Sequence, residues 1–271
     1  MNPYSPSSYR TAGRRSQVVP AALLALSALL SSPVAAQTIE DALPLLDSGN
    51  PKQIEEGIEL LGLIGTAEAL PPLQQRIRRG LTPPLLRHAI ATLAAIGLPA
   101  AGPSLIALTN HRRPEVRADS LEALGLLRLK EAYPTLVGGL SDGHPQVRSA
   151  AAIALGQLGD PTALPVLFQA LDKGNLEAST ALGTLTPPGQ VQRLLGYLEQ
   201  LPFRSLSPAF TAVILRKDID DSIRLAVIAR VADLATREVR GYLADLLDRE
   251  EGRLSARAKN AARAAIRGIS P

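Results

Sequence analysis

The chain has no cysteine and no tryptophan, and only 3 % of its 271 residues are aromatic. The lack of cysteine excludes disulfides, thiolate zinc sites and a cysteine nucleophile. Strands draw on aromatic and β-branched side chains, so the shortage of aromatics argues against a β-sandwich. Hydrophobic residues nevertheless make up 46 % of the chain, with alanine and leucine taking the place of aromatics. This composition is typical of stacked helices.

Acidic residues are missing from the first 36 positions. Three arginines there precede an apolar run over 18–30, and small residues at 34–36 follow it. This order is typical of a secretory signal peptide over 1–36 and predicts cleavage before Gln37. The apolar run is short for a membrane span, so an uncleaved anchor is the weaker alternative. We expect an exported chain, in the periplasm, in the thylakoid lumen or outside the cell.

The basic charge of the chain resides largely in this leader. The net charge of +4 falls to about +1 once the three leader arginines are removed, leaving 26 Lys and Arg against 25 Asp and Glu. A basic patch and stacking aromatics are what a nucleic-acid binder needs. We therefore predict no nucleic-acid partner.

Prolines recur at a nearly constant spacing through the middle of the chain. They lie 32, 31 and 31 residues apart, at Pro71, Pro103, Pro134 and Pro165. An apolar residue followed by arginine recurs in step with them, at Leu86–Arg87, Val116–Arg117 and Val147–Arg148, with Ile223–Arg224 further on. A fixed period of this length is the signature of a repeat architecture.

Each period contains two predicted helices. In 142–171, a proline follows the turn and apolar residues then recur at helical spacing up to 158, before Gly159-Asp160-Pro161 breaks the chain. One such hairpin cannot bury both its faces, so neighbouring hairpins must stack. We predict an all-α fold for 37–271: a right-handed α-solenoid of about seven hairpins of roughly 31 residues.

Residues 142–161, with the sequence DGHPQVRSAAAIALGQLGDP, resemble a HEAT repeat. They are most similar to the phycobilisome-lyase HEAT-like type, and the resemblance covers most of 48–250. It implies an armadillo-type fold, in which an aspartate at the turn between helices and an arginine six residues on form a ladder between neighbouring units. Two pairs match this spacing, Asp142 with Arg148 and Asp218 with Arg224. Arg87 and Arg117 lack such an aspartate, which leaves their partners open.

Two segments depart from the repeat. Residues 202–217 are too short for a hairpin and contain Phe203 and Phe210, so we predict an irregular segment that is either a degenerate repeat or a docking point. Residues 253–268 are basic on one face and apolar on the other, which predicts a capping helix. Its apolar stripe is mostly alanine, so any membrane contact through this helix would be weak.

Side chains with obvious chemistry are few. The only histidines are His88, His111 and His144, and no phosphate loop, nucleophile motif or zinc motif is present. Deoxyhypusine hydroxylases, which are also HEAT-like, bind iron through His-Glu pairs, and no such pair occurs here. The adjacent acids Glu55 and Glu56 are interpreted as solvated. We predict no catalytic residue, no cofactor and no metal ligand.

The function that these features favour is an exported scaffold that binds a protein without catalysis. Its predicted protein-binding residues are His111, Arg112, Arg113, His144, Gln146, Phe203 and Phe210. The alternative is a lyase, an isomerase or an enzyme subunit of the phycobilisome-lyase type, which would need His88, Arg117 and Arg148 in one pocket with carboxylates. The resemblance implies bilin attachment, but the leader argues against it because phycobilisomes assemble in the cytoplasm.

Overall fold

The computed structural model describes residues 38–270, so the predicted leader over 1–36 lies outside the described residues. The described part contains helices and no strand. Its α-helices are α2 (Ile39–Leu46), α3 (Pro51–Ile64), α4 (Leu70–Arg79), α5 (Pro83–Ile96), α6 (Gly102–Leu108), α7 (Pro114–Leu126), α8 (Tyr133–Gly139), α9 (Pro145–Leu158), α10 (Leu164–Asp172), α11 (Ala178–Leu185), α12 (Val191–Gly196), α13 (Phe203–Leu215), α14 (Asp221–Ala232), α15 (Arg237–Arg249) and α16 (Ala256–Gly268). None of them is long and apolar enough to cross a membrane.

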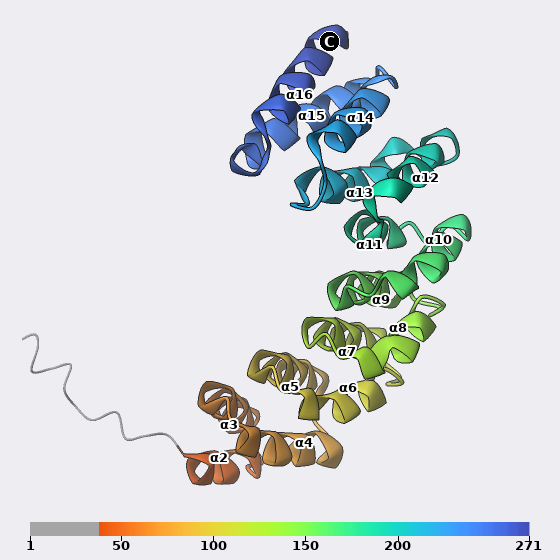
Figure 1. Cartoon of the computed structure of the whole chain (residues 1–271). Coiled ribbons are helices and arrows are strands. Elements are labelled where there is room, and N and C mark those ends of the chain that lie inside the picture. The colour runs from red at the N-terminus through yellow and green to blue at the C-terminus, as the bar shows by residue number, and fades with distance from the viewer. Residues whose placement is uncertain (1–37, 271) are drawn as a thin grey trace, which may run out of the picture. The chain divides into compact units, whose positions relative to one another are not determined.

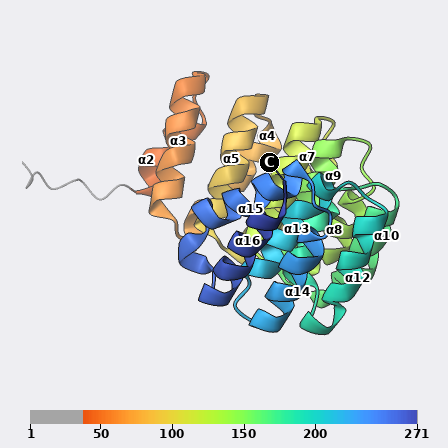
Figure 2. The ribbon, with the colours of Figure 1, turned by 90° about the horizontal axis from the view of Figure 1, so that it is seen from above.

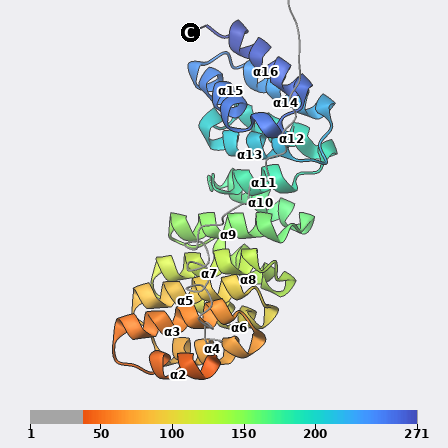
Figure 3. The same ribbon diagram turned by 90° about the vertical axis from the view of Figure 1, so that its left-hand side faces the viewer.

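The helices form two rows (Figures 1 and 3). We call α3, α5, α7, α9, α11 and α13 the first row, and α4, α6, α8, α10 and α12 the second row. Successive first-row helices pack side by side, as α3, α5 and α7 do in Figure 2. The two rows bury one continuous apolar core. The predicted α-solenoid is confirmed.

The proline period has a local cause. Pro71, Pro103, Pro134 and Pro165 each occupy the second position of a second-row helix. The backbone N–H of that position has no acceptor inside a helix, so proline costs nothing there. First-row helices α3, α5 and α9 end at Gly65, Gly97 and Gly159, which have positive φ values of 65°, 75° and 75°. Together these residues start and stop the helices at a constant interval.

Small residues set the spacing of the first row. A β-carbon on Gly125 of α7 would lie 2.6 Å from the Cα atom of Ala154 in α9. One on Gly183 of α11 would lie 2.7 Å from the Cα atom of Ala209 in α13. The backbones of neighbouring helices are therefore so close that only glycine fits at these points.

The segment predicted to be irregular, 202–217, instead contains the 13-residue helix α13. Its apolar residues fall at helical spacing and are buried: Phe203, Leu206, Phe210 and Val213. Pro208 lies inside the helix without ending it. Because α13 packs against α11 as the next first-row helix, it continues the stack. Helix α16 packs against both α14 and α15 at the end of the chain.

We expect Gly125→Ala to lower the free energy of unfolding by about 1–3 kcal/mol, because the new methyl group would overlap the backbone of α9. Gly138→Ala is the matched control, since Gly138 of α8 has no atom within 4 Å of the position of a β-carbon. It should be neutral or stabilise by up to about 1 kcal/mol. Urea unfolding of both variants measures the difference, and equal effects would contradict the proposed close packing.

Candidate functional site

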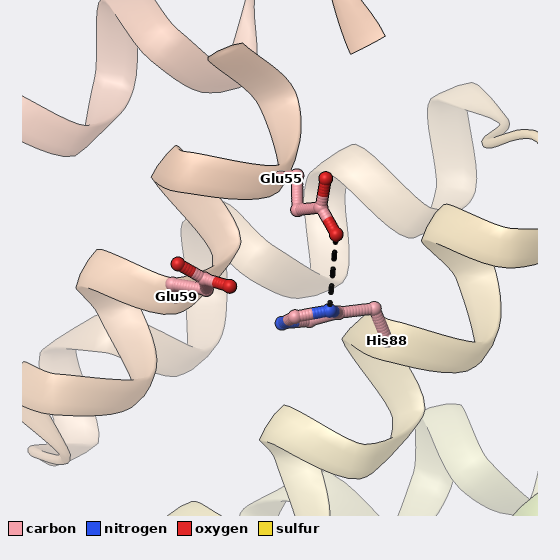
Figure 4. Close-up of side chains that lie close together, drawn as sticks. All are labelled: Glu55, Glu59 and His88. Atoms are coloured by element: carbon pink, nitrogen blue, oxygen red, sulfur yellow. Dashed lines mark ion pairs between the residues drawn. The ribbon is translucent and has the colours of Figure 1, made fainter. Parts of the chain in front are cut away.

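An acidic cluster with one histidine lies on the first row, between α3 and α5. Glu55 and Glu59 are four residues apart on α3 and therefore share a face, and His88 of α5 points toward them (Figure 4). The Nδ1 atom of His88 is 3.9 Å from the Oε1 atom of Glu55. One ligand atom from each of the three side chains lies within 4.8 Å of the other two. No other group of three such side chains occurs in 38–270.

This cluster offers two carboxylates and one imidazole to a cation. A structural zinc site takes four protein ligands and a catalytic one takes three. Half of the Glu55 side chain is exposed, so water competes for any ion bound there. Sequence analysis interpreted Glu55 as solvated and predicted no metal ligand. It missed the cluster because Glu59 and His88 are 29 residues apart, and only the stacking of α5 on α3 brings them together.

An arginine ladder joins successive turns. The guanidinium of Arg117 donates to both carboxylate oxygens of Asp142, with Nη2–Oδ1 at 2.7 Å and Nε–Oδ2 at 2.9 Å. It also donates to the carbonyl oxygen of His111, at 3.0 Å, in the turn before its own helix. Both charged side chains are largely buried. The hydrogen bond from Arg117 lowers the pKa of Asp142 below the ordinary value for aspartate. Arg117 therefore connects its own turn to the turn of the next hairpin.

The other arginines of the predicted ladder have different partners. Arg148 donates to the carbonyl oxygen of Asp142, at 3.2 Å, while the carboxylate of that residue binds Arg117. Arg87 pairs with Asp119 of α7. At the end of the chain, the carboxylate of Asp218 pairs with Arg216 and that of Asp221 with Arg224. Asp218 and Arg224, which match the spacing of the motif, thus each form an ion pair with another residue.

Five of the predicted protein-binding residues lie in two equivalent turns or, for Gln146, at the start of the helix α9 that follows; we call them the turn ridge. They are His111, Arg112, Arg113, His144 and Gln146. All are exposed except His111, which is half-buried and accepts a hydrogen bond from the backbone N–H of Arg113, at 3.2 Å. The ridge is a polar surface.

The other two predicted binding residues are wrong for this role. Phe210 is fully buried and Phe203 is only 8 % exposed. Their rings stack with centroids 6.4 Å apart, and Phe203 also makes an edge-to-face contact with Tyr242 of α15, at 5.1 Å. They lie inside the core because α13 is a complete helix that turns its apolar face inward.

Sequence analysis also missed large apolar side chains that stand exposed on the first row. Leu63 of α3 is 77 % exposed, Leu126 of α7 is 61 % exposed and Ile153 of α9 is 39 % exposed. Leu63 and Leu126 are 63 residues apart and occupy equivalent positions two repeats apart. Aligning α3 with α7 pairs these two leucines from the sequence alone, whereas Ala95 occupies the equivalent position of the repeat between them.

Of the residues that an enzyme would have to unite, Arg117 and Arg148 both bind Asp142. His88 lies against Glu55 instead, across α3 and α5. Arg148 lines a cavity between α8 and α10. These contacts connect turns and helices of neighbouring hairpins.

We expect Asp142→Asn to lower the free energy of unfolding by about 1–3 kcal/mol at pH 7, because it removes the charge from a largely buried ion pair. Since the pKa of Asp142 is lowered in the folded chain, the pair stabilises the fold above the ordinary aspartate pKa of about 4. Its contribution is lost as the pH falls through the lowered value. The difference between wild type and variant should therefore shrink in acid.

Urea unfolding between pH 7 and pH 3 checks this expectation. Asp248→Asn, which changes an exposed carboxylate on α15, is the control and should stay within about 0.5 kcal/mol of wild type. A difference for Asp142→Asn that does not depend on pH would contradict the role of the ion pair.

Comparison with known proteins supports the architecture. Residues 103–186 match the model of HEAT repeats. No curated protein matches the chain by sequence. A homology model of the full-length AP-3 complex in an intermediate open conformation is 15 % identical, with a TM-score of 0.58, over 92 % of this chain and 54 % of that chain. This chain thus spans about half of that one, and at this identity the likeness concerns the fold alone.

Two enzyme structures are also similar. The complex of CpcE and CpcF of phycocyanin lyase from Nostoc sp. PCC7120 is 21 % identical, with a TM-score of 0.49, over 86 % of this chain and 95 % of that chain. Human deoxyhypusine hydroxylase in complex with glycerol is 23 % identical, with a TM-score of 0.35, over 78 % of this chain and 85 % of that chain. Residues 103–186 therefore match HEAT repeats, and the described part of the chain folds into an α-solenoid of stacked helical hairpins.

Proposed function

We propose that the chain is an exported, non-catalytic scaffold that binds a protein partner along the first row. The observation that carries this proposal is the exposure of Leu63, Leu126 and Ile153 on helices of one row. A stable fold gains nothing from large apolar side chains in water, whereas an interface buries such side chains as anchors. A solenoid holds them on a long, preformed surface.

The surroundings of Leu126 fit an interface. A groove of about 230 Å³ lies between α5 and α7, and Leu126 and Ala91 form part of its apolar wall. The ion pair between Arg87 and Asp119 also lines it. Glu122 lies in the same groove, where burial and the charge of Asp119 raise its pKa. Apolar anchors surrounded by charged groups are the usual anatomy of a protein interface.

The partners of the candidate catalytic side chains support a role without catalysis. General acid–base work needs side chains that converge on one reacting position. Arg117 instead binds a carboxylate and carbonyl oxygens of two turns, and Arg148 binds carbonyl oxygens of its own turn. Both arginines thus stabilise turns of the helical stack.

Affinity capture tests the binding face. The chain from Gln37 onward is the bait, and envelope or lumenal extract provides the partner. We expect the wild-type chain to capture one stoichiometric protein partner. The double variant Leu63→Asp and Leu126→Asp should capture at least tenfold less of it, because binding would have to desolvate a charge in an apolar pocket of the partner. Both side chains are exposed, so the variant should keep its unfolding midpoint.

The double variant Arg112→Glu and Arg113→Glu on the turn ridge is the matched comparison. Loss of the partner in this variant alone would move the binding face to the turn ridge. If both variants retained the partner, neither the first row nor the turn ridge would be the binding face.

Export is tested by expressing the full chain in a bacterium and determining the N-terminus of the product. We expect it to begin at Gln37, because small residues occupy the positions before the predicted cleavage point. Ala36→Trp should block processing and leave the leader attached. A wild-type chain that keeps its leader and stays in the membrane would instead support the anchor.

A further inference from the structure

A cavity of about 370 Å³ opens between α8 and α10, at the end of their hairpins. Its wall is partly apolar, through Val137, Leu140 and Val166. Its polar wall comes from Ser141, Arg148, Gln169, Lys173 and Asn175. The volume falls in the range of small-molecule sites.

The same cavity exists one repeat earlier, with a different charge. A pocket of about 320 Å³ lies between α6 and α8 and is lined by Asp142. There Asp142 binds Arg117, at 2.7 Å, as part of the ladder. Thirty-one residues on, Arg148 stands in the place of Arg117 and Lys173 in the place of Asp142. A cation has thus replaced the acid of the ladder.

This replacement leaves Arg148 without an acidic partner. It donates hydrogen bonds to the carbonyl oxygens of Asp142 and Gly143, and no carboxylate within 38–270 forms an ion pair with it. Asp142 is paired with Arg117, and Asp172, which precedes Lys173, accepts a hydrogen bond from the hydroxyl of Tyr197, at 2.6 Å. Two cations therefore line one cavity.

Asn175 adds an independent observation. It lines the same cavity, is 6 % exposed, and donates through Nδ2 to the carbonyl oxygen of Leu140, at 3.2 Å. Its Oδ1 atom is buried without a hydrogen-bond donor. A buried acceptor left unpaired is costly, and such atoms in native proteins usually have a partner.

We propose that this cavity binds a small organic anion that carries a hydroxyl group, such as a hydroxycarboxylate or a phosphate ester. The anionic group pairs with Arg148 and Lys173, and the hydroxyl donates to the Oδ1 atom of Asn175. The carbon skeleton lies against Val137 and Val166. The site does not depend on the proposed scaffold function, since the exposed apolar residues of the first row take no part in it.

Titration calorimetry at fixed ionic strength tests the site with two matched pairs of probes. Citrate differs from tricarballylate by one hydroxyl, and glycerol 3-phosphate differs from propyl phosphate by two hydroxyls. We expect at least one hydroxylated probe to bind saturably, with at least tenfold higher affinity than its counterpart. Binding of citrate would identify the anionic group as a carboxylate, and binding of glycerol 3-phosphate would identify it as a phosphate. Failure of both to bind saturably would overturn the proposal.

Variants locate the site. Lys173→Asp restores the acid that the preceding repeat has at this position, so it should keep or raise the melting temperature. It should also lower the affinity for the probe at least tenfold, because a cation is replaced by an anion. Lys52→Asp makes the same change of charge on α3, at an exposed position, and should bind within twofold of wild type. Equal binding by wild type and Lys173→Asp would overturn the assignment. Equal affinity for both members of a probe pair would refute the role of Asn175.

Discussion

The close approach of first-row helices is the constraint on which the rest of the structure depends. A hairpin of this size cannot bury both its faces, so its stability comes from its neighbours. The backbones of α7 and α9 meet where Gly125 faces Ala154, and those of α11 and α13 where Gly183 faces Ala209. This contact fixes the spacing of the hairpins, and therefore decides which side chains in successive turns can reach one another.

The arginine ladder follows from that spacing. Arg117 can bind its own turn and the carboxylate of Asp142 at once because the two turns lie one hairpin apart. At the next step the same geometry sets Arg148 beside a cavity lined by Lys173. The same spacing of turns thus produces an ion pair in one repeat and a cationic cavity in the next, because Asp142 of the first is replaced by Lys173 in the second.

Features with a local cause could be predicted from the sequence, and features that depend on distant residues could not. The recurring prolines and glycines start and stop helices by themselves, so the hairpin period was evident. The acid that binds Arg117 lies 25 residues away, in the next turn, and Glu59 meets His88 only through packing. Residues 202–217 lacked the repeat motif, yet the spacing of Phe203, Leu206 and Phe210 is helical, and burial against α11 makes it a helix.

The two proposed surfaces meet on a single helix. Ile153, exposed on the first row, and Arg148, which lines the cavity, both belong to α9. In a solenoid each repeat contacts only its neighbours, so an anion in the cavity can affect a partner on the first row only by moving α9 or the turn before it. The close contact of Gly125 with Ala154 holds α9 against α7, which resists such movement. The two sites should therefore bind their ligands largely independently.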